Sequence, residues 1–401
     1  MTGEALAGSR FEVEVGPVAH GGHFVARHEG RVVFVRHSLP GERVVVEVTE
    51  GDTESRFLRG DAIEVVAASP DRVPAPCPFS GPGRCGGCDF QHVSLPAQRE
   101  LKAAVVGEQL SRLAGLDVDV RVEPVPGDSE GLDWRTRVRW AVDGAGRPGL
   151  RKHRSHEVVP VDDCRIAHPS LPRPGADLPR PVAEVETLWS STGERLRLLT
   201  DRDGAVTEDG PPLLHERCRG RTFEVTGSGF WQVHPGAADV LTAAVLEALA
   251  PEPGERAADL YAGVGLFSAF LAERVGPSGS VVAVEADPVA VEDAARNLAD
   301  LPQVRVLRGR VDRVVGHPRG PLAAGADLVV LDPPRTGARR PVVRRVAELA
   351  PRAVAYVACD PAALARDVGL FAEEGYRLAG LRAFDLFPMT HHVECVAQLV
   401  R

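Results

Sequence analysis

The sequence is poor in lysine, which occurs only at Lys102 and Lys152, so almost all of its positive charge is arginine. With a formal net charge of -9 at pH 7, the chain is not expected to bind nucleic acid over its whole surface, although a local basic groove is compatible with this charge. The arginine bias accompanies 33 prolines and 41 glycines, which is typical of a GC-rich coding sequence. Arginine clusters alone therefore do not indicate a function here.

Long apolar stretches are also missing from the 401 residues. No run approaches the roughly eighteen apolar residues of a membrane span. The first residues, Met1-Thr-Gly-Glu-Ala, lack the basic and apolar regions of a secretion signal. We therefore expect a soluble, cytoplasmic protein with no membrane partner. The chain is long enough for two or three domains, and we expect it to act as a monomer.

Residues 11–66 have the pattern of a small β-barrel. Short runs of alternating hydrophobicity are separated by turns at Gly21-Gly22 and Pro40-Gly41. This spacing predicts an OB-like barrel, a shape that often binds nucleic acid. An SH3-like fold or another small barrel is equally compatible with the pattern.

Cysteine is too scarce for a disulfide framework, since a chain of this length has only seven, but four of them are spaced like metal ligands. Cys77, Cys85 and Cys88 lie in a loop rich in glycine and proline, and Cys164 is the best candidate for a fourth ligand. Four thiolates hold either an iron–sulfur cluster or structural zinc, and their number does not decide between the two. Cysteines without any ligand are the remaining alternative. Cys218 has no neighbouring cysteine and is expected to be an ordinary core thiol.

Two further segments of the N-terminal half are periodic. Residues 95–113 follow the period of a helix, and Pro96 is acceptable in its first turn. Residues 134–140 alternate like a strand, which places Arg135, Arg137 and Arg139 on one side. Such a row can contact RNA phosphates. A solvated sheet edge is an alternative of nearly equal weight.

From residue 255 onward, strands alternate with helices, which predicts a doubly wound, mostly parallel sheet of the Rossmann type. The run Asp259-Leu-Tyr-Ala-Gly263-Val-Gly265 reads as a strand and a glycine-rich turn, and the next strand ends in Glu285. Glycines let the backbone approach a nucleotide-like ligand, and the acid can accept hydrogen bonds from ribose hydroxyls. A dinucleotide dehydrogenase would have a third glycine where this chain has Ser268. The pattern therefore favours S-adenosylmethionine as the ligand.

Two later strand ends carry candidate chemistry. Asp332-Pro-Pro-Arg follows a buried strand, and its prolines predict a rigid turn that can hold a planar base near the methyl donor. Residues 353–358 predict another buried strand, which ends at Cys359 and is followed by Asp360-Pro361 and a helix. Open α/β sheets place their chemistry at such strand ends, and a helix N-terminus lowers a thiol pKa. Cys359 is therefore predicted to be a thiolate nucleophile.

A thiolate beside a methyl donor indicates methylation of a pyrimidine at carbon. Addition of the Cys359 thiolate to C6 of uracil would make C5 nucleophilic enough to take the methyl group. A base must then remove the C5 proton so that the thiolate can leave. Glu394, at the start of the last predicted strand, is the best candidate. The competing interpretations are a small buried cysteine and a surface acid.

Together these motifs resemble the RNA uridine-5-methyltransferase family, specifically the branch with a TRAM domain and an iron–sulfur cluster that acts on 23S rRNA. The barrel resembles the TRAM domain, an RNA-binding module, through Gly21-Gly22, residues 30–35 and residues 39–42. The resemblance covers nearly the whole chain. It implies S-adenosylmethionine as methyl donor, a [4Fe-4S] cluster in preference to zinc, and structured RNA as partner. The residues that it implies are Cys359 as nucleophile and Glu394 as base, Gln232, Tyr261, Gly263, Gly265, Glu285 and Asp332 for the donor, and Cys77, Cys85, Cys88 and Cys164 for the cluster.

The resemblance also implies the domain organisation. We expect a TRAM-like barrel over residues 1–70, a central α+β iron–sulfur domain over 71–94 and 122–226, a crossover helix over 95–121 and the methyltransferase domain over 227–401. His234, Leu266 and Arg310 stand where the family usually has other residues.

Three alternatives to this function remain. The same reaction could act on tRNA, or the chain could be a non-catalytic RNA-binding or folding factor that keeps the scaffold. A radical enzyme that uses the cluster is disfavoured, because such enzymes usually carry Cys-x3-Cys-x2-Cys and this chain does not.

Overall fold

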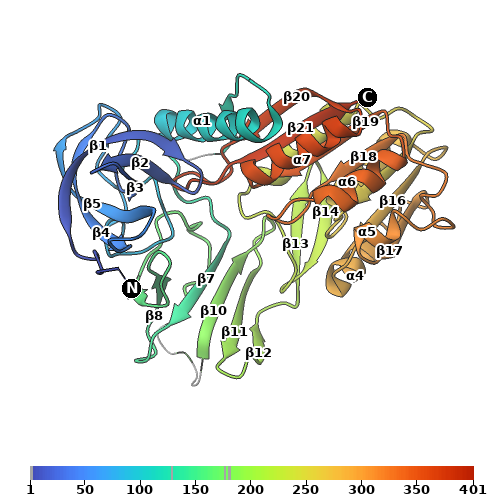
Figure 1. Cartoon of the computed structure of the whole chain (residues 1–401). Helices are drawn as coiled ribbons and strands as arrows, with labels where there is room; N and C mark the ends of the chain where they lie inside the picture. The colour runs from blue at the N-terminus through green and yellow to red at the C-terminus, as the bar shows by residue number, and fades with distance from the viewer. Residues whose placement is uncertain (1–2, 128–129, 176–177, 179–181) are drawn as a thin grey trace.

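The computed structural model describes residues 3–127, 130–175, 178 and 182–401 of the chain. Figure 1 shows a small barrel at one end of the molecule, a large sheet with helices at the other, and antiparallel strands between them. None of the described helices is long and apolar enough to cross a membrane.

The N-terminal strands form the predicted barrel, which is closed in the order β1-β2-β3-β5-β4. Valines that alternate along these strands fill its interior together with Phe24 and Leu39. The strands are β1 (Arg10–Ala19), β2 (His23–His28), β3 (Arg31–Arg36), β4 (Arg43–Glu50) and β5 (Phe57–Ala67).

The central part of the chain is a six-stranded antiparallel sheet with an adjoining hairpin. Its described residues contain no α-helix, so the α part of the predicted α+β domain is not found there. The sheet has the order β12-β11-β10-β7-β8-β9, and β13 pairs with β14. The strands are β7 (Arg137–Val142), β8 (Pro148–Arg151), β9 (Val158–Pro160), β10 (Val182–Trp189), β11 (Arg195–Asp201), β12 (Val206–Asp209), β13 (Leu213–Cys218) and β14 (Arg221–Thr226).

The C-terminal part contains an eight-stranded sheet of order β17-β16-β15-β18-β19-β21-β20-β6. The pairs from β17 to β19 are parallel, whereas β21 runs antiparallel to both of its neighbours. This is the predicted doubly wound, mostly parallel sheet. Its strands are β6 (Val122–Glu123), β15 (Arg256–Leu260), β16 (Ser280–Glu285), β17 (Val304–Arg308), β18 (Leu328–Leu331), β19 (Ala353–Ala358), β20 (Arg377–Phe384) and β21 (Glu394–Val400).

Helices cover both faces of this sheet because its strands are apolar on both sides. Along β19, Val354 and Tyr356 belong to one core cluster, and Ala355 and Val357 belong to the other. The first face packs on α1, α5, α6 and α7, and the second packs on α2, α3 and α4. The helices are α1 (Leu95–Ala114), α2 (Ala237–Leu249), α3 (Leu266–Val275), α4 (Pro288–Asn297), α5 (Val311–Val314), α6 (Arg339–Glu348) and α7 (Pro361–Glu373).

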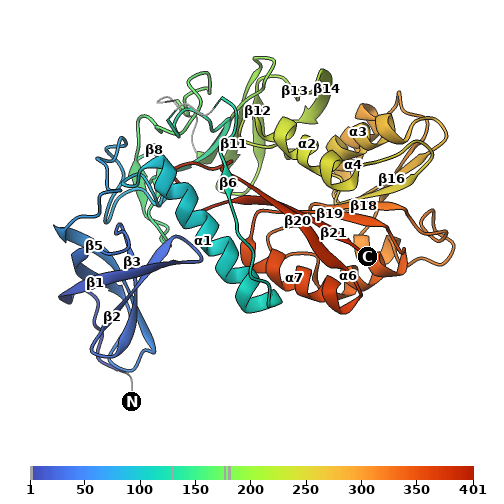
Figure 2. The ribbon, with the colours of Figure 1, turned by 90° about the horizontal axis from the view of Figure 1, so that it is seen from above.

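Helix α1 is the helix predicted over residues 95–113, and it lies between the barrel and the large sheet (Figure 2). It accommodates a proline in its first turn and ends at Gly115, whose φ of 67° is left-handed. The buried Lys102 Nζ lies 2.5 Å from Asp385 Oδ1 and donates to the Phe387 carbonyl at 3.0 Å. Removing one partner from such a buried pair leaves an uncompensated charge, which typically costs about 3–5 kcal/mol. One of the two lysines thus fixes α1 to the C-terminal part.

Candidate active site

Cys359 and Glu394 lie opposite each other at the edge of the large sheet. Strand β19 ends at Ala358 as predicted, and Ala358 pairs with Cys395 in the antiparallel β21. One step further along this register, Cys359 faces Glu394, the first residue of β21. Directly opposed residues in antiparallel strands have their side chains on the same face. Glu394 is only 4% exposed, so the carboxyl is buried beside the thiol and is not a surface acid.

The pKa of the Cys359 thiol lies above its ordinary value, whereas the helix N-terminus predicts a lowered pKa. Burial raises the pKa of Cys359 to about 11, and the neighbouring Glu394 and Asp332 raise it further, whereas Arg335 opposes the shift. The dipole of α7 acts only near the first turn of the helix. The amides of that turn already have a carboxylate acceptor in addition to any thiolate. Asp360 caps this helix and accepts a hydrogen bond from Ala363 N at 2.7 Å.

Asp332 joins the same group of acids at the end of β18. Its amide donates to the Leu260 carbonyl at 3.2 Å, which fixes the turn against β15. Burial and the neighbouring Asp259 raise the pKa of Asp332 to about 7. Burial and Asp332 raise the pKa of Glu394 well above its usual range. The ends of these strands therefore bring together carboxyl groups whose pKa values are raised.

The glycine-rich turn is tied to the end of β16 through Glu285. The carboxylate of Glu285 accepts hydrogen bonds from Gly263 N at 2.9 Å, Ala286 N at 2.6 Å and Asp287 N at 2.8 Å. Gly265 caps α3 with a φ of 90°, and a Cβ there would lie 2.8 Å from the Leu298 side chain. Only glycine suits this position, because both its conformation and its space exclude a side chain.

Two other residues complete this turn. Tyr261 has a φ of 68°, which is unusual for a residue with a side chain, and its amide donates to the Val284 carbonyl at 3.0 Å. Asp259 is fully buried and accepts a hydrogen bond from Ser268 Oγ at 2.6 Å. Its other oxygen, Oδ1, has no hydrogen-bond partner among the described residues. An unpaired buried carboxylate oxygen is suited to a cationic ligand such as an ammonium group.

Gln232 lies in a different hollow from Cys359. It lines this hollow with residues of the β13–β14 hairpin and of the central sheet, among them Arg137. Arg137 donates to Glu186 Oε1 at 2.9 Å, and Arg139 lies 3.2 Å from a Glu184 oxygen. Two of the three arginines predicted to face RNA are therefore paired with carboxylates.

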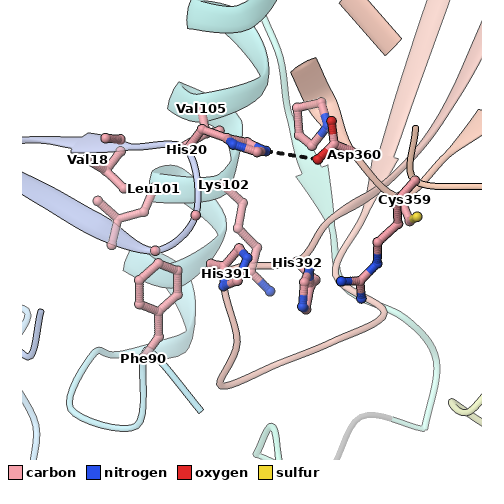
Figure 3. Close-up of a pocket in the computed structure, with 15 residues that line it drawn as sticks. Val18, His20, Phe90, Leu101, Lys102, Val105, Cys359, Asp360, His391 and His392 are labelled. Carbon is pink, nitrogen blue, oxygen red and sulfur yellow. Dashed lines mark hydrogen bonds and ion pairs between the residues drawn. The ribbon is translucent and has the colours of Figure 1, made fainter. Parts of the chain in front are cut away.

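Cys359 lines a cavity of about 220 Å³ between three parts of the chain. The barrel contributes the turn around His20, α1 contributes Lys102, and the C-terminal part contributes Arg335 and His392. Figure 3 shows His20 reaching across this cavity toward Asp360, the residue after Cys359. Their side chains are 3.1 Å apart, and this hydrogen bond raises the pKa of His20. The sequence gives no signal for this contact, since its partners are 340 positions apart.

The four cysteines predicted as ligands line a second cavity, of about 70 Å³. Two of their sulfurs are near polar hydrogens, because Gly87 N lies 3.4 Å from Cys85 Sγ and Gln91 Nε2 lies 3.4 Å from Cys88 Sγ. The described residues nevertheless contain no group of three or more His, Cys, Asp or Glu side chains arranged to hold a metal ion. Cys218 is buried elsewhere, with its sulfur 3.7 Å from Thr242 Oγ1, as expected of a core thiol.

Three family models match separate parts of the chain. One described as TRAM domain matches residues 4–63, and one described as tRNA (Uracil-5-)-methyltransferase matches residues 324–401. A third, described as protein-L-isoaspartate(D-aspartate) O-methyltransferase, matches residues 235–320. The first covers most of the barrel, and the other two cover most of the large sheet.

Individual relatives match almost the full length. An uncharacterized RNA methyltransferase of Streptomyces coelicolor is 50% identical, over 98% of this chain and 93% of its own. A 23S rRNA (uracil(1939)-C(5))-methyltransferase of Chromohalobacter salexigens is 34% identical, over 96% of this chain and 88% of its own. The crystal structure of a Pyrococcus abyssi tRNA (uracil-54, C5)-methyltransferase with S-adenosyl-L-homocysteine has a TM-score of 0.73 at 22% identity and covers 97% of this chain and all of its own. This likeness confirms the fold of barrel and Rossmann-like sheet.

Proposed function

This chain belongs to the RNA uracil-5-methyltransferase family, and we propose that it transfers a methyl group from S-adenosylmethionine to C5 of a uridine in 23S rRNA. The observation that carries the proposal is the register of β19 and β21, which pairs Ala358 with Cys395 and so brings the next residue, Cys359, beside Glu394. A nucleophile and a base on one face, beside the Asp332 turn, are what methylation of uracil at carbon requires.

In the first step, the Cys359 sulfur bonds to C6 of uracil, and the C5–C6 π electrons move toward the O4 carbonyl. Carbon C5 thereby becomes nucleophilic and takes the methyl group, while the bond between methyl and sulfonium sulfur breaks. The donor supplies the electrophilic methyl group. The carboxylate of Glu394 then removes the C5 proton, the C5–C6 double bond re-forms, and the Cys359 thiolate leaves.

The raised pKa values fit a site that is activated by its ligands. Burial raises the pKa of the Cys359 thiol to about 11 and raises the pKa of the Glu394 carboxyl well above its usual range. A positive charge nearby favours the ionised form of an acid. We therefore expect the sulfonium charge of the donor to lower both pKa values, so that thiolate forms when the donor is bound.

What supports S-adenosylmethionine as donor is the geometry of the glycine-rich turn. The unpaired Oδ1 of the buried Asp259 is suited to the donor's ammonium group. Glu285 accepts three backbone amides, which leaves one of its about four lone-pair sites, on Oε2, for a ribose hydroxyl. We propose that Tyr261, Gly263, Gly265 and Asp332 complete this site, together with Gln232 from the adjoining hollow.

The choice of RNA is tested by methylation of purified substrates. The Chromohalobacter salexigens relative, named for 23S rRNA, is 34% identical, which favours 23S rRNA over tRNA. We expect labelled methyl groups to enter unmodified 23S rRNA as 5-methyluridine at least about 10²-fold faster than they enter unmodified tRNA, because each misfitted contact costs about 1–3 kcal/mol. The measurement is digestion of each RNA followed by mass spectrometry of the nucleosides. Methylation of tRNA alone would overturn the 23S assignment, and no 5-methyluridine in either RNA would overturn the activity.

We further propose that Cys77, Cys85, Cys88 and Cys164 hold a [4Fe-4S] cluster. What supports it is their convergence on one cavity and the hydrogens near two of the sulfurs, since hydrogen bonds to sulfur are typical of such clusters. The cluster would cross-link the loop at 77–88 to the segment around Cys164 beneath the central sheet.

Replacing one proposed ligand tests the cluster. Anaerobically purified protein is expected to contain about four irons per chain, and Cys164→Ser is expected to lose most of this iron together with the visible absorption. The control is Cys218→Ser, because Cys218 is buried outside the loop and its loss should leave iron unchanged. One zinc per chain in a colourless protein would show that the four cysteines hold structural zinc and not a cluster. An unchanged iron content in Cys164→Ser would show that Cys164 is not a ligand.

A further inference from the structure

The segment that delivers Glu394 is held mainly by the N-terminal half of the chain. We call residues 385–393, between β20 and β21, the base loop, because Glu394 follows directly after them. In Figure 3 its residues His391 and His392 lie between α1 and Cys359. Contacts that fix this loop therefore also set the position of the proposed base.

The first anchor is the backbone of Met389. Its carbonyl accepts hydrogen bonds from Asp89 N at 3.0 Å and from Phe90 N at 2.9 Å, the two residues that directly follow the cysteine-rich loop at 77–88. Its amide donates to Gln98 Oε1 in α1 at 2.8 Å. Met389 has a φ of 67°, a conformation that a side chain disfavours, so these three bonds hold the loop in a turn that it would not prefer alone.

The second anchor is the side chain of Asp89. One oxygen, Oδ2, accepts from His391 N at 3.2 Å and lies 2.6 Å from His391 Nδ1. The other oxygen lies 3.4 Å from Arg36 Nη2 in the barrel. Asp89 is 8% exposed, and a Cβ at Gly22 would lie 2.9 Å from His391 Cβ, so the barrel packs tightly against this contact.

The side chain of Gln98 links the two anchors. Its amide nitrogen donates to the Phe90 carbonyl at 3.1 Å and the Val93 carbonyl at 2.9 Å, while its oxygen accepts from Met389 N. Gln98 is fully buried. It therefore fixes the distance between the end of the cysteine-rich loop and the base loop.

We propose that Asp89 and Gln98 are positioning residues for the proton-abstraction step, which act through the base loop to hold the Glu394 carboxyl at C5 of the bound uracil. The inference rests on the proposed function. It assigns Asp89, next to the cysteine-rich loop, and Gln98 of α1 a part in catalysis, because they fix the position of the base. A misplacement of about 1 Å at a reacting group can cost about 10²-fold in rate.

The step affected separates positioning from folding or RNA binding. In Asp89→Ala, steady-state methylation should fall about 10- to 10²-fold, while the denaturation-resistant Cys359–RNA adduct should accumulate during turnover, because elimination is slowed and addition is not. Asp89→Asn keeps one acceptor oxygen and should restore part of the rate. If the residue only supports folding or RNA binding, adduct and methylation should fall together, and that result would overturn the proposal.

Controls distinguish a failure of this proposal from a loss of the cluster and from a failure of the proposed function. Gln98→Leu should give the same adduct accumulation from the side of α1, and Gln98→Glu, which keeps the acceptor for Met389 N, should partly restore the rate. Glu42→Gln changes another buried carboxylate, which accepts a hydrogen bond from Arg72 Nε at 2.6 Å and does not belong to the contacts of the base loop. This variant should not change the fraction of protein trapped as adduct. Iron content is measured in each variant. Wild-type protein that forms no adduct with 5-fluorouridine RNA would overturn the proposed function itself, whatever the variants do.

Discussion

Replacing Cys359 with alanine is expected to abolish methylation of RNA, with a loss of at least about 10³-fold. The reason is chemical, because C5 of uracil is a poor nucleophile until a group adds at C6. No other described thiol lies at this strand end facing Glu394, since Cys395, although adjacent in the register, belongs to the core on the other face. The measurement is transfer of labelled methyl groups to unmodified RNA in a single turnover.

Cys395→Ala is the matched control for this variant. Its thiol is fully buried beside Ala358, so the substitution tests the effect of a lost sulfur at the same sheet edge without removing the proposed nucleophile. We expect near-normal methylation from the control. Methylation retained in Cys359→Ala would exclude the covalent route.

Replacing Glu394 with glutamine is expected to stop the reaction after methyl transfer. Addition and methylation need only Cys359 and the donor, whereas release needs a base for the C5 proton. Turnover should fall about 10²- to 10⁴-fold, the range of general-base catalysis. A protein–RNA adduct that survives denaturation should accumulate to about one per active site and be visible on a gel.

The adduct of Glu394→Gln should be absent when Cys359 is also replaced by alanine. Glutamine retains the shape of Glu394 in its buried position, so the variant alters proton transfer more than packing. Rapid turnover without adduct in Glu394→Gln would show that another group removes the proton.

The barrel and the parallel sheet were predictable because their signals are local. Alternating valines with glycine turns produced the closed barrel, and buried strands ending at Glu285, Asp332 and Cys359 produced the sheet edge where the candidate residues meet. The position of Glu394 at the start of β21 was predicted as well. That it faces Cys359 was not readable from the sequence, since it depends on the register between β19 and β21.

Tertiary effects account for what the sequence did not predict. The helix N-terminus predicts a lowered pKa for Cys359, but burial and the neighbouring Glu394 and Asp332 raise it. The contact between Asp89 and His391 was not predictable either, because the two residues are 302 positions apart and form no recognisable motif together. The row of Arg135, Arg137 and Arg139 was compatible with RNA contact or with a solvated sheet edge. In the structure, Glu186 and Glu184 on β10 pair with Arg137 and Arg139. In each of these examples, contacts between segments that are distant in the sequence determine the environment of the side chain.

The most direct test of the covalent mechanism is mass spectrometry of the adduct formed by Glu394→Gln after digestion with trypsin and nuclease. Cleavage after Arg352, Arg366 and Arg382 places Cys359 in the peptide 353–366 and Cys395 in the peptide 383–401. Peptide 353–366 is expected to carry one methylated uridine nucleotide through Cys359. A nucleotide on peptide 383–401, or no nucleotide on either peptide, would contradict the assignment of Cys359 as the nucleophile.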